Sequence, residues 1–160
     1  MFDGSDELQL VELAHMGIDG NQYYFKPEDE SGGTRRLLMI LNPIFNALDH
    51  GTLVLIDELD AGLHTQVAEA IFAMFADPEW NPKGAQLVAT THDTNLLQTS
   101  ALRRDQIWFT EKDAEGASQV YPLTDFRTRK RDDLENAYLE GRYGAVPPRN
   151  VLARLRGNGR

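Results

Sequence analysis

Apolar residues follow two patterns along the chain, short strand-like runs and longer segments with helical spacing. Residues 8–14 and 21–26 are rich in Leu, Val, Tyr and Phe, and they flank a turn-forming stretch at 18–21. This arrangement predicts an N-terminal antiparallel β-hairpin.

The next segments predict helices that alternate with strands. Apolar side chains recur at helical spacing over 37–48, in a helix that Pro43 is expected to kink or split and Gly51 to end. The continuous apolar run at 53–56 is typical of a strand buried on both faces of a parallel sheet. The remaining predicted elements are a helix over 63–75, a strand over 86–90, a short helix capped by Asp93, a hairpin from 106–110 and 119–123, and a final helix over 132–140. This order is typical of an α/β fold with helical crossovers.

Composition places the chain among ordinary globular proteins. Its 160 residues are 41% hydrophobic, which suits a single domain with one core. No apolar run reaches the roughly 18 residues of a membrane span, and the acidic N-terminus is unlike a signal peptide. The absence of cysteine excludes disulfides and thiolate metal sites. We therefore expect a cytoplasmic protein with no membrane partner.

Charge is unevenly distributed. The net charge of −9 disfavours a protein whose whole surface binds a nucleic-acid backbone. Residues 1–80 carry 3 basic and 15 acidic side chains, whereas residues 81–160 carry 13 and 10. A nucleic-acid contact would therefore use the C-terminal part, through the basic run Arg127, Arg129, Lys130 and Arg131. The alternative for this run is a solvated turn.

Candidate chemistry lies where the predicted strands end. Asp57 and Glu58 directly follow the 53–56 strand, at the carboxyl end where open α/β sheets bind their ligands. Because neighbouring strand residues point to opposite sides, one carboxylate can hold Mg²⁺ while the other orients a water molecule for attack on a phosphoryl group. His92 ends the next strand and can donate a hydrogen bond to a phosphate oxygen. The alternatives are a pair of acids that only cap the strand and a structural histidine.

A glycine-containing loop precedes the first predicted helix. The two glycines, Gly32 and Gly33, allow close backbone approach, and the helix amides together with the Ser31 hydroxyl can form an anion site. The alternative is a flexible loop in which Ser31 or Thr34 acts as an N-cap.

In this order, the loop, the acidic strand end and the histidine resemble the motifs of the ABC superfamily of ATPases. Residues 30–34 resemble the signature loop, 53–58 the Walker B strand, 61–64 the D-loop, and His92 the switch histidine. The resemblance implies ATP and Mg²⁺ as cofactors, with Glu58 and His92 as catalytic residues and Asp57 as the metal ligand. The nucleotide-binding residues that it implies are Ser31, Gly32, Gly33, Asp60 and Gly62.

The resemblance also implies a domain organisation. It predicts that residues 1–145 are the C-terminal half of an ABC-type ATPase domain, from the signature loop to the C-terminal helix. This half would contain the C-terminal part of a P-loop NTPase sheet, with helical crossovers and N- and C-terminal β-hairpins, and residues 146–160 would form a flexible arm. His64 and Leu59-Asp60 differ from the residues usual in membrane transporters. The chain instead resembles the soluble branch related to overcoming-lysogenisation-defect ATPases and structural-maintenance-of-chromosomes proteins, many of which occur in phage-defence operons.

No lysine in the sequence follows a glycine, so the GxxxxGK[ST] P-loop is absent from it. The expected partner is therefore a P-loop-bearing half or subunit, in a homodimer or heterodimer across the nucleotide, with an effector nuclease as a further partner. Without the P-loop-bearing half or subunit, we expect no ATP hydrolysis. Two hypotheses compete with this one: a non-hydrolysing remnant or regulatory binding module, and a metal-dependent nuclease that uses Asp57, Glu58, Asp60, His64, His92 and Asp93.

Overall fold

The computed structural model describes residues 12–129 and 132–146. They form two compact units, one ending at His92 and one beginning at Asp93, and each is described by itself. Residues 8–11 of the first predicted strand, Lys130 and Arg131 of the basic run, and residues 147–160 of the predicted arm lie outside the described residues.

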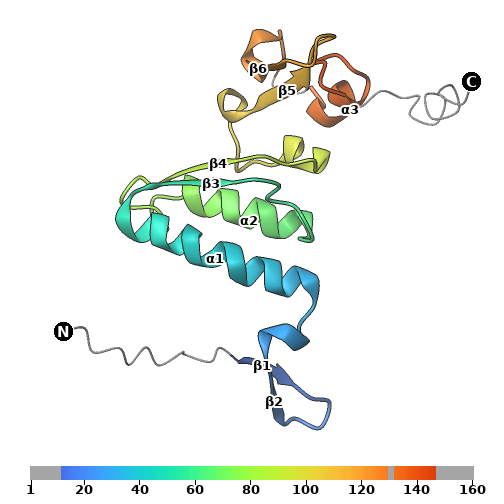
Figure 1. Ribbon diagram of the computed structural model, residues 1–160. Coiled ribbons are helices and arrows are strands. Elements are labelled where there is room, and N and C mark those ends of the chain that lie inside the picture. The colour runs from blue at the N-terminus through green and yellow to red at the C-terminus, as the bar shows by residue number, and fades with distance from the viewer. Residues whose placement is uncertain (1–11, 130–131, 147–160) are drawn as a thin grey trace, which may run out of the picture. The chain divides into compact units, whose positions relative to one another are not determined.

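The first unit opens with the predicted hairpin (Figure 1). Strands β1 (Leu13–Met16) and β2 (Gln22–Phe25) pair antiparallel, with Leu13 opposite Phe25. The turn is closed by Asp19, which accepts hydrogen bonds from the backbone and side chain of Asn21. A 3₁₀ helix, η1 (Pro27–Asp29), follows the hairpin.

Helix α1 (Gly32–His50) begins at Ser31, whose hydroxyl accepts a hydrogen bond from the Thr34 backbone N–H. It ends at Gly51, as predicted, because Gly51 adopts the left-handed conformation (φ 68°) that terminates helices. Pro43 was expected either to kink this helix or to split it. It does not split the helix, which continues through it. Pro43 is exposed, so water can reach the backbone whose hydrogen bond the ring removes.

A β-α-β unit forms the centre of the first unit. Strands β3 (Leu53–Ile56) and β4 (Gln86–Ala89) are parallel, with Leu53 opposite Gln86, and α2 (Thr65–Ala76) connects them. Figure 1 shows α1 and α2 on the same side of this strand pair. Their core contains Ile44, Ala47, Val54, Ile56, Leu59, Ala68 and Ile71. The predicted α/β class is confirmed.

The prediction that strand 53–56 is buried on both faces is wrong for the described residues. Val54 and Ile56 are buried, whereas Leu53 and Leu55 are 54% and 70% exposed, and Val88 on β4 is 58% exposed. One face of the sheet is therefore packed against helices, and the other presents aliphatic side chains to solvent. Continuous apolar runs are usual where both faces are covered.

The second unit contains the predicted C-terminal hairpin and final helix. Its elements are η2 (Thr94–Gln98), η3 (Arg104–Gln106), β5 (Trp108–Lys112), β6 (Ser118–Pro122), η4 (Leu123–Asp125) and α3 (Leu134–Leu139). β5 and β6 pair antiparallel. Asp93 caps η2 by accepting a hydrogen bond from the Asn95 backbone N–H, as predicted.

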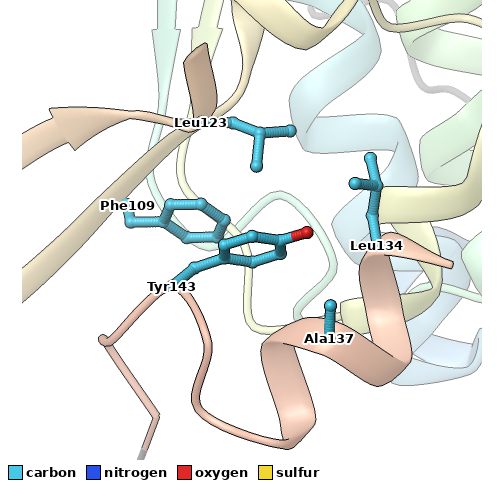
Figure 2. Close-up of a cluster of buried hydrophobic side chains, with 5 residues drawn as sticks. All are labelled: Phe109, Leu123, Leu134, Ala137 and Tyr143. Carbon is cyan, nitrogen blue, oxygen red and sulfur yellow. The ribbon is translucent and has the colours of Figure 1, made fainter. Parts of the chain in front are cut away.

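An aromatic core holds the second unit together. Figure 2 shows the Phe109 ring beside the Tyr143 ring, with their centroids 5.6 Å apart. The buried members of the cluster are Phe109, Leu123, Leu134, Ala137 and Tyr143. In the basic run, the Arg129 backbone N–H donates to the Asp132 carboxylate at 2.5 Å. Among the described residues, no helix is both long and apolar enough to span a membrane.

Candidate functional site

The carboxyl end of β3 carries Asp57 and Glu58, both exposed to solvent. Glu58 has a φ of 49°, in the left-handed region that residues other than glycine seldom adopt. The Arg36 guanidinium of α1 donates hydrogen bonds to the carbonyl oxygens of Asp57 and Glu58, at 3.0 and 3.3 Å. Arg36 therefore joins the start of α1 to the acid pair.

Thr90 follows β4 and joins the ends of the two parallel strands. Its hydroxyl donates to Asp57 Oδ1 at 2.5 Å and accepts from the Glu58 backbone N–H at 2.8 Å. Its carbonyl accepts from the Leu59 backbone N–H at 2.9 Å. One side chain thus orients the Asp57 carboxylate and fixes the backbone of Glu58.

His92 lies beside the acid pair. Its Nε2 is 3.7 Å from Glu58 Oε1, and the two side chains are 84% and 58% exposed. Its backbone N–H donates to the Asp60 carboxylate, at 3.2 and 3.4 Å from the two oxygens. Glu58 and His92 are therefore neighbours that a ligand can reach from solvent, and Asp60 holds the backbone of His92 in place.

The glycine loop contacts the turn that follows the acid pair. Gly33 packs so closely against Gly62 that a Cβ atom on Gly33 would lie 2.6 Å from the Gly62 carbonyl oxygen. Gly62 has a φ of 73°, which suits glycine. Gly32 is exposed with open space around it, and Ser31 forms the N-cap that the sequence left as an alternative role. The loop can still present backbone amides to an anion, because the first amides of a helix lack intrahelical partners.

The structure brings the predicted site residues of the two strands and the loop to one end of the β3–β4 pair. Contacts link Gly33 to Gly62, Asp60 to His92, and His92 to Glu58. Sequence reasoning missed Arg36 and Thr90. A signal for Thr90 was its place at the strand end before His92, whereas Arg36 carries none, because its partners are backbone carbonyls more than twenty residues away.

The nuclease residue set is not assembled as a metal site. His64 caps α2 by accepting a hydrogen bond from the Gln66 backbone N–H at 3.3 Å. Across residues 12–129 and 132–146, no group of three or more His, Asp or Glu side chains is arranged to hold a metal ion. A single carboxylate can suffice for Mg²⁺, because this ion keeps several waters and binds substrate phosphates directly. Asp57 provides one exposed carboxylate at the end of β3.

One family comparison bears on this arrangement. The sequence profile of the family described as "AAA domain, putative AbiEii toxin, Type IV TA system" matches residues 2–98, more than half of the chain. No curated protein and no solved structure matches this chain. The match covers the loop, both parallel strands and the site residues that they carry, and a domain of this type implies nucleotide binding. The chain belongs to this family of AAA-type, ATPase-related domains.

Proposed function

We propose that this chain is an ATPase module of ABC type that contributes the signature loop, the Walker B acids and the switch histidine to a composite active site. The observation that carries the proposal is the placement of Glu58 and His92, with Nε2 and Oε1 3.7 Å apart, at the carboxyl end of two parallel strands. Open α/β sheets bind ligands at this end. Family membership supports an ATPase-like module, and the individual roles are our assignment.

Each acid takes a separate role in this proposal. Glu58 orients a water molecule for attack on the terminal phosphoryl group and accepts its proton, and its exposed carboxylate is accessible for this. Asp57 holds Mg²⁺, which when bound neutralises charge on the phosphate oxygens. His92 donates a hydrogen bond to the terminal phosphate, and the bond from its backbone N–H to Asp60 keeps it at the strand end.

The phosphate-cradling P-loop is supplied by a second polypeptide or by another segment of the protein. Two observations support this part of the proposal. No lysine in the sequence follows a glycine, and the sheet face that carries Leu53, Leu55 and Val88 is exposed. Parallel sheets are ordinarily covered on both faces, so this face fits a partner that packs against it. In the assembled dimer, homomeric or heteromeric, Ser31, Gly32 and Gly33 contact the nucleotide held by the other subunit.

Split complementation tests the proposal. The P-loop half is the segment from the first strand to just before the signature loop of a family member that contains GxxxxGK[ST]. It is co-expressed with this chain, and Mg·ATP hydrolysis is measured. We expect hydrolysis that Glu58→Gln reduces at least about a hundredfold, as loss of a general base does. Glu69→Gln, on α2, is the matched control and is expected to keep the activity of the unaltered complex.

Two outcomes would contradict the proposal. A complex that binds Mg·ATP but hydrolyses it equally well with Glu58→Gln would remove the assigned base. A complex that binds Mg·ATP and hydrolyses nothing would favour the competing function, a regulatory binding module, which the absence of a glycine-lysine P-loop in the sequence supports.

A further inference from the structure

The first two residues of the signature loop form a very short link between two helices. η1 ends at Asp29 and α1 begins at Gly32, so Glu30 and Ser31 alone link the two helices. Glu30 has an extended backbone, with a ψ of 162°, and Ser31 has a ψ of 154°. Their backbones are bonded to the neighbouring helices, since the Glu30 N–H donates to the Pro27 carbonyl and the Ser31 carbonyl accepts from Arg35, and their side chains add further contacts.

Each of the two linking side chains is hydrogen-bonded to one other residue. Ser31 accepts a hydrogen bond from the Thr34 backbone N–H at 3.1 Å, inside α1. Glu30 points the other way, and the His15 Nε2–H of β1 donates to Glu30 Oε1 at 2.5 Å. The Glu30 side chain is 8% exposed, although most acidic residues lie at the surface.

The surroundings of this pair favour a well-defined geometry. The His15 ring meets the Phe25 ring edge to face, with centroids 5.1 Å apart. A cavity of about 320 Å³ adjoins the pair and is walled by Tyr23 and Phe25 as well as by His15 and Glu30. The His15 side chain is 52% exposed, but Glu30 is shielded from water, and a hydrogen bond to a carboxylate is stronger than one between neutral groups.

From these contacts we propose that His15 is a positioning residue for the signature loop. By holding Glu30 against the β1–β2 hairpin, it fixes the direction in which the chain enters Ser31, and so the direction of the amides of Gly32 and Gly33. His15 acts through Glu30 and touches no reacting group. The assignment deepens the proposed function and rests on it, because it gives the hairpin a part in ATP binding.

Amide hydrogen exchange in the full chain tests the structural half of this assignment. Thr34 and Arg35 donate their backbone N–H groups to Ser31, so their exchange reports on the start of α1. With His15→Ala, exchange at these two amides is expected to rise about tenfold, the effect of losing one hydrogen bond to a carboxylate. His15→Gln keeps a side-chain N–H donor and is expected to restore most of the protection.

His50→Ala is the matched control. His50 contacts the Asn46 carbonyl oxygen at the opposite end of the same helix, so this variant is expected to leave Thr34 and Arg35 unchanged. A rise in exchange along the whole of α1 with His15→Ala, or no rise at Thr34 and Arg35, would overturn the proposal, because positioning predicts a change confined to the first turn.

Kinetics of the complemented complex test the functional half. His15→Ala is expected to raise KM for ATP about fivefold or more with a smaller effect on kcat, since the signature loop binds nucleotide held by the partner. His50→Ala is expected to change neither value. An unchanged KM in an active complex would overturn the assignment of His15. A wild-type complex without hydrolysis would overturn the proposed function instead. In that case the exchange data by themselves would test whether His15 positions the loop.

Discussion

Thr90→Val is a nearly isosteric change that removes one hydroxyl from the candidate site. That hydroxyl makes two hydrogen bonds, as donor to Asp57 and as acceptor from the Glu58 backbone N–H. A neutral hydrogen bond contributes about 1 kcal/mol net, and one to a carboxylate about 1.5–3 kcal/mol. All three residues are exposed, so water can replace part of this loss. We therefore expect the free energy of unfolding of the first unit to fall by about 1.5 kcal/mol.

Urea denaturation measures this loss. With a slope of about 1 kcal/mol per molar urea, the midpoint of the first unit should fall by about 1.5 M. Trp80 lies in the first unit and Trp108 in the second, so fluorescence in a Trp108→Phe background reports on the first unit by itself. Thr90→Ser keeps the hydroxyl and is expected to recover most of the stability.

Thr52→Val provides the matched control. Thr52 is exposed just before β3, and within the described residues its hydroxyl makes no hydrogen bond. This variant is expected to change stability by less than about 0.5 kcal/mol. If Thr90→Val and Thr52→Val give the same midpoint, the Thr90 hydroxyl does not stabilise the strand ends, and the account of the acid pair given above is wrong.

Three further predictions concern separate contacts. Gly33→Ala is expected to destabilise the first unit, because its Cβ would lie 2.6 Å from the Gly62 carbonyl oxygen, whereas Gly32→Ala, in open space, should be neutral or stabilising by up to about 1 kcal/mol in urea denaturation. Arg36→Ala should lower the first unit's stability by about 1–2 kcal/mol, because two carbonyl oxygens lose their donor, and a midpoint equal to that of the unaltered chain would contradict this. Burial raises the pKa of Tyr138, so the stability from its neutral hydroxyl is fully present below the ordinary pKa of about 10 and is lost as pH rises through the higher folded value. Tyr138→Phe should weaken this alkaline dependence, as followed by near-ultraviolet circular dichroism of the second unit; burial also raises the pKa of Tyr121 and Tyr143, so part of the dependence should remain.

Local pattern was sufficient to predict the element order. Turn residues marked both hairpins, helical spacing marked α1 and α2, and a left-handed glycine ended α1 where Gly51 was predicted to end it. Asp57, Glu58 and His92 were placed at the ends of two predicted strands, and because parallel strands share an edge, Glu58 and His92 are neighbours there. These features depend on short-range chemistry and on a general rule of sheet topology.

Features set by distant contacts could not be predicted in the same way. An apolar run shows that a strand can be buried on both faces, but Leu53 and Leu55 are exposed because α1 and α2 lie on one side of the sheet. The close approach of Gly33 to Gly62 requires two turns to meet. Glycine also serves turns and caps, so its presence at either position did not identify a partner.

Glu58 offers a further argument about function. Its φ of 49° is a conformation that glycine adopts without strain and that costs other residues of the order of 1 kcal/mol or more. The surrounding structure sustains it from both sides, since Arg36 binds its carbonyl oxygen and the Thr90 hydroxyl binds its N–H. A carboxylate held at this point beside His92, at a cost that glycine would avoid, favours a chemical role for Glu58 over a strand-capping one.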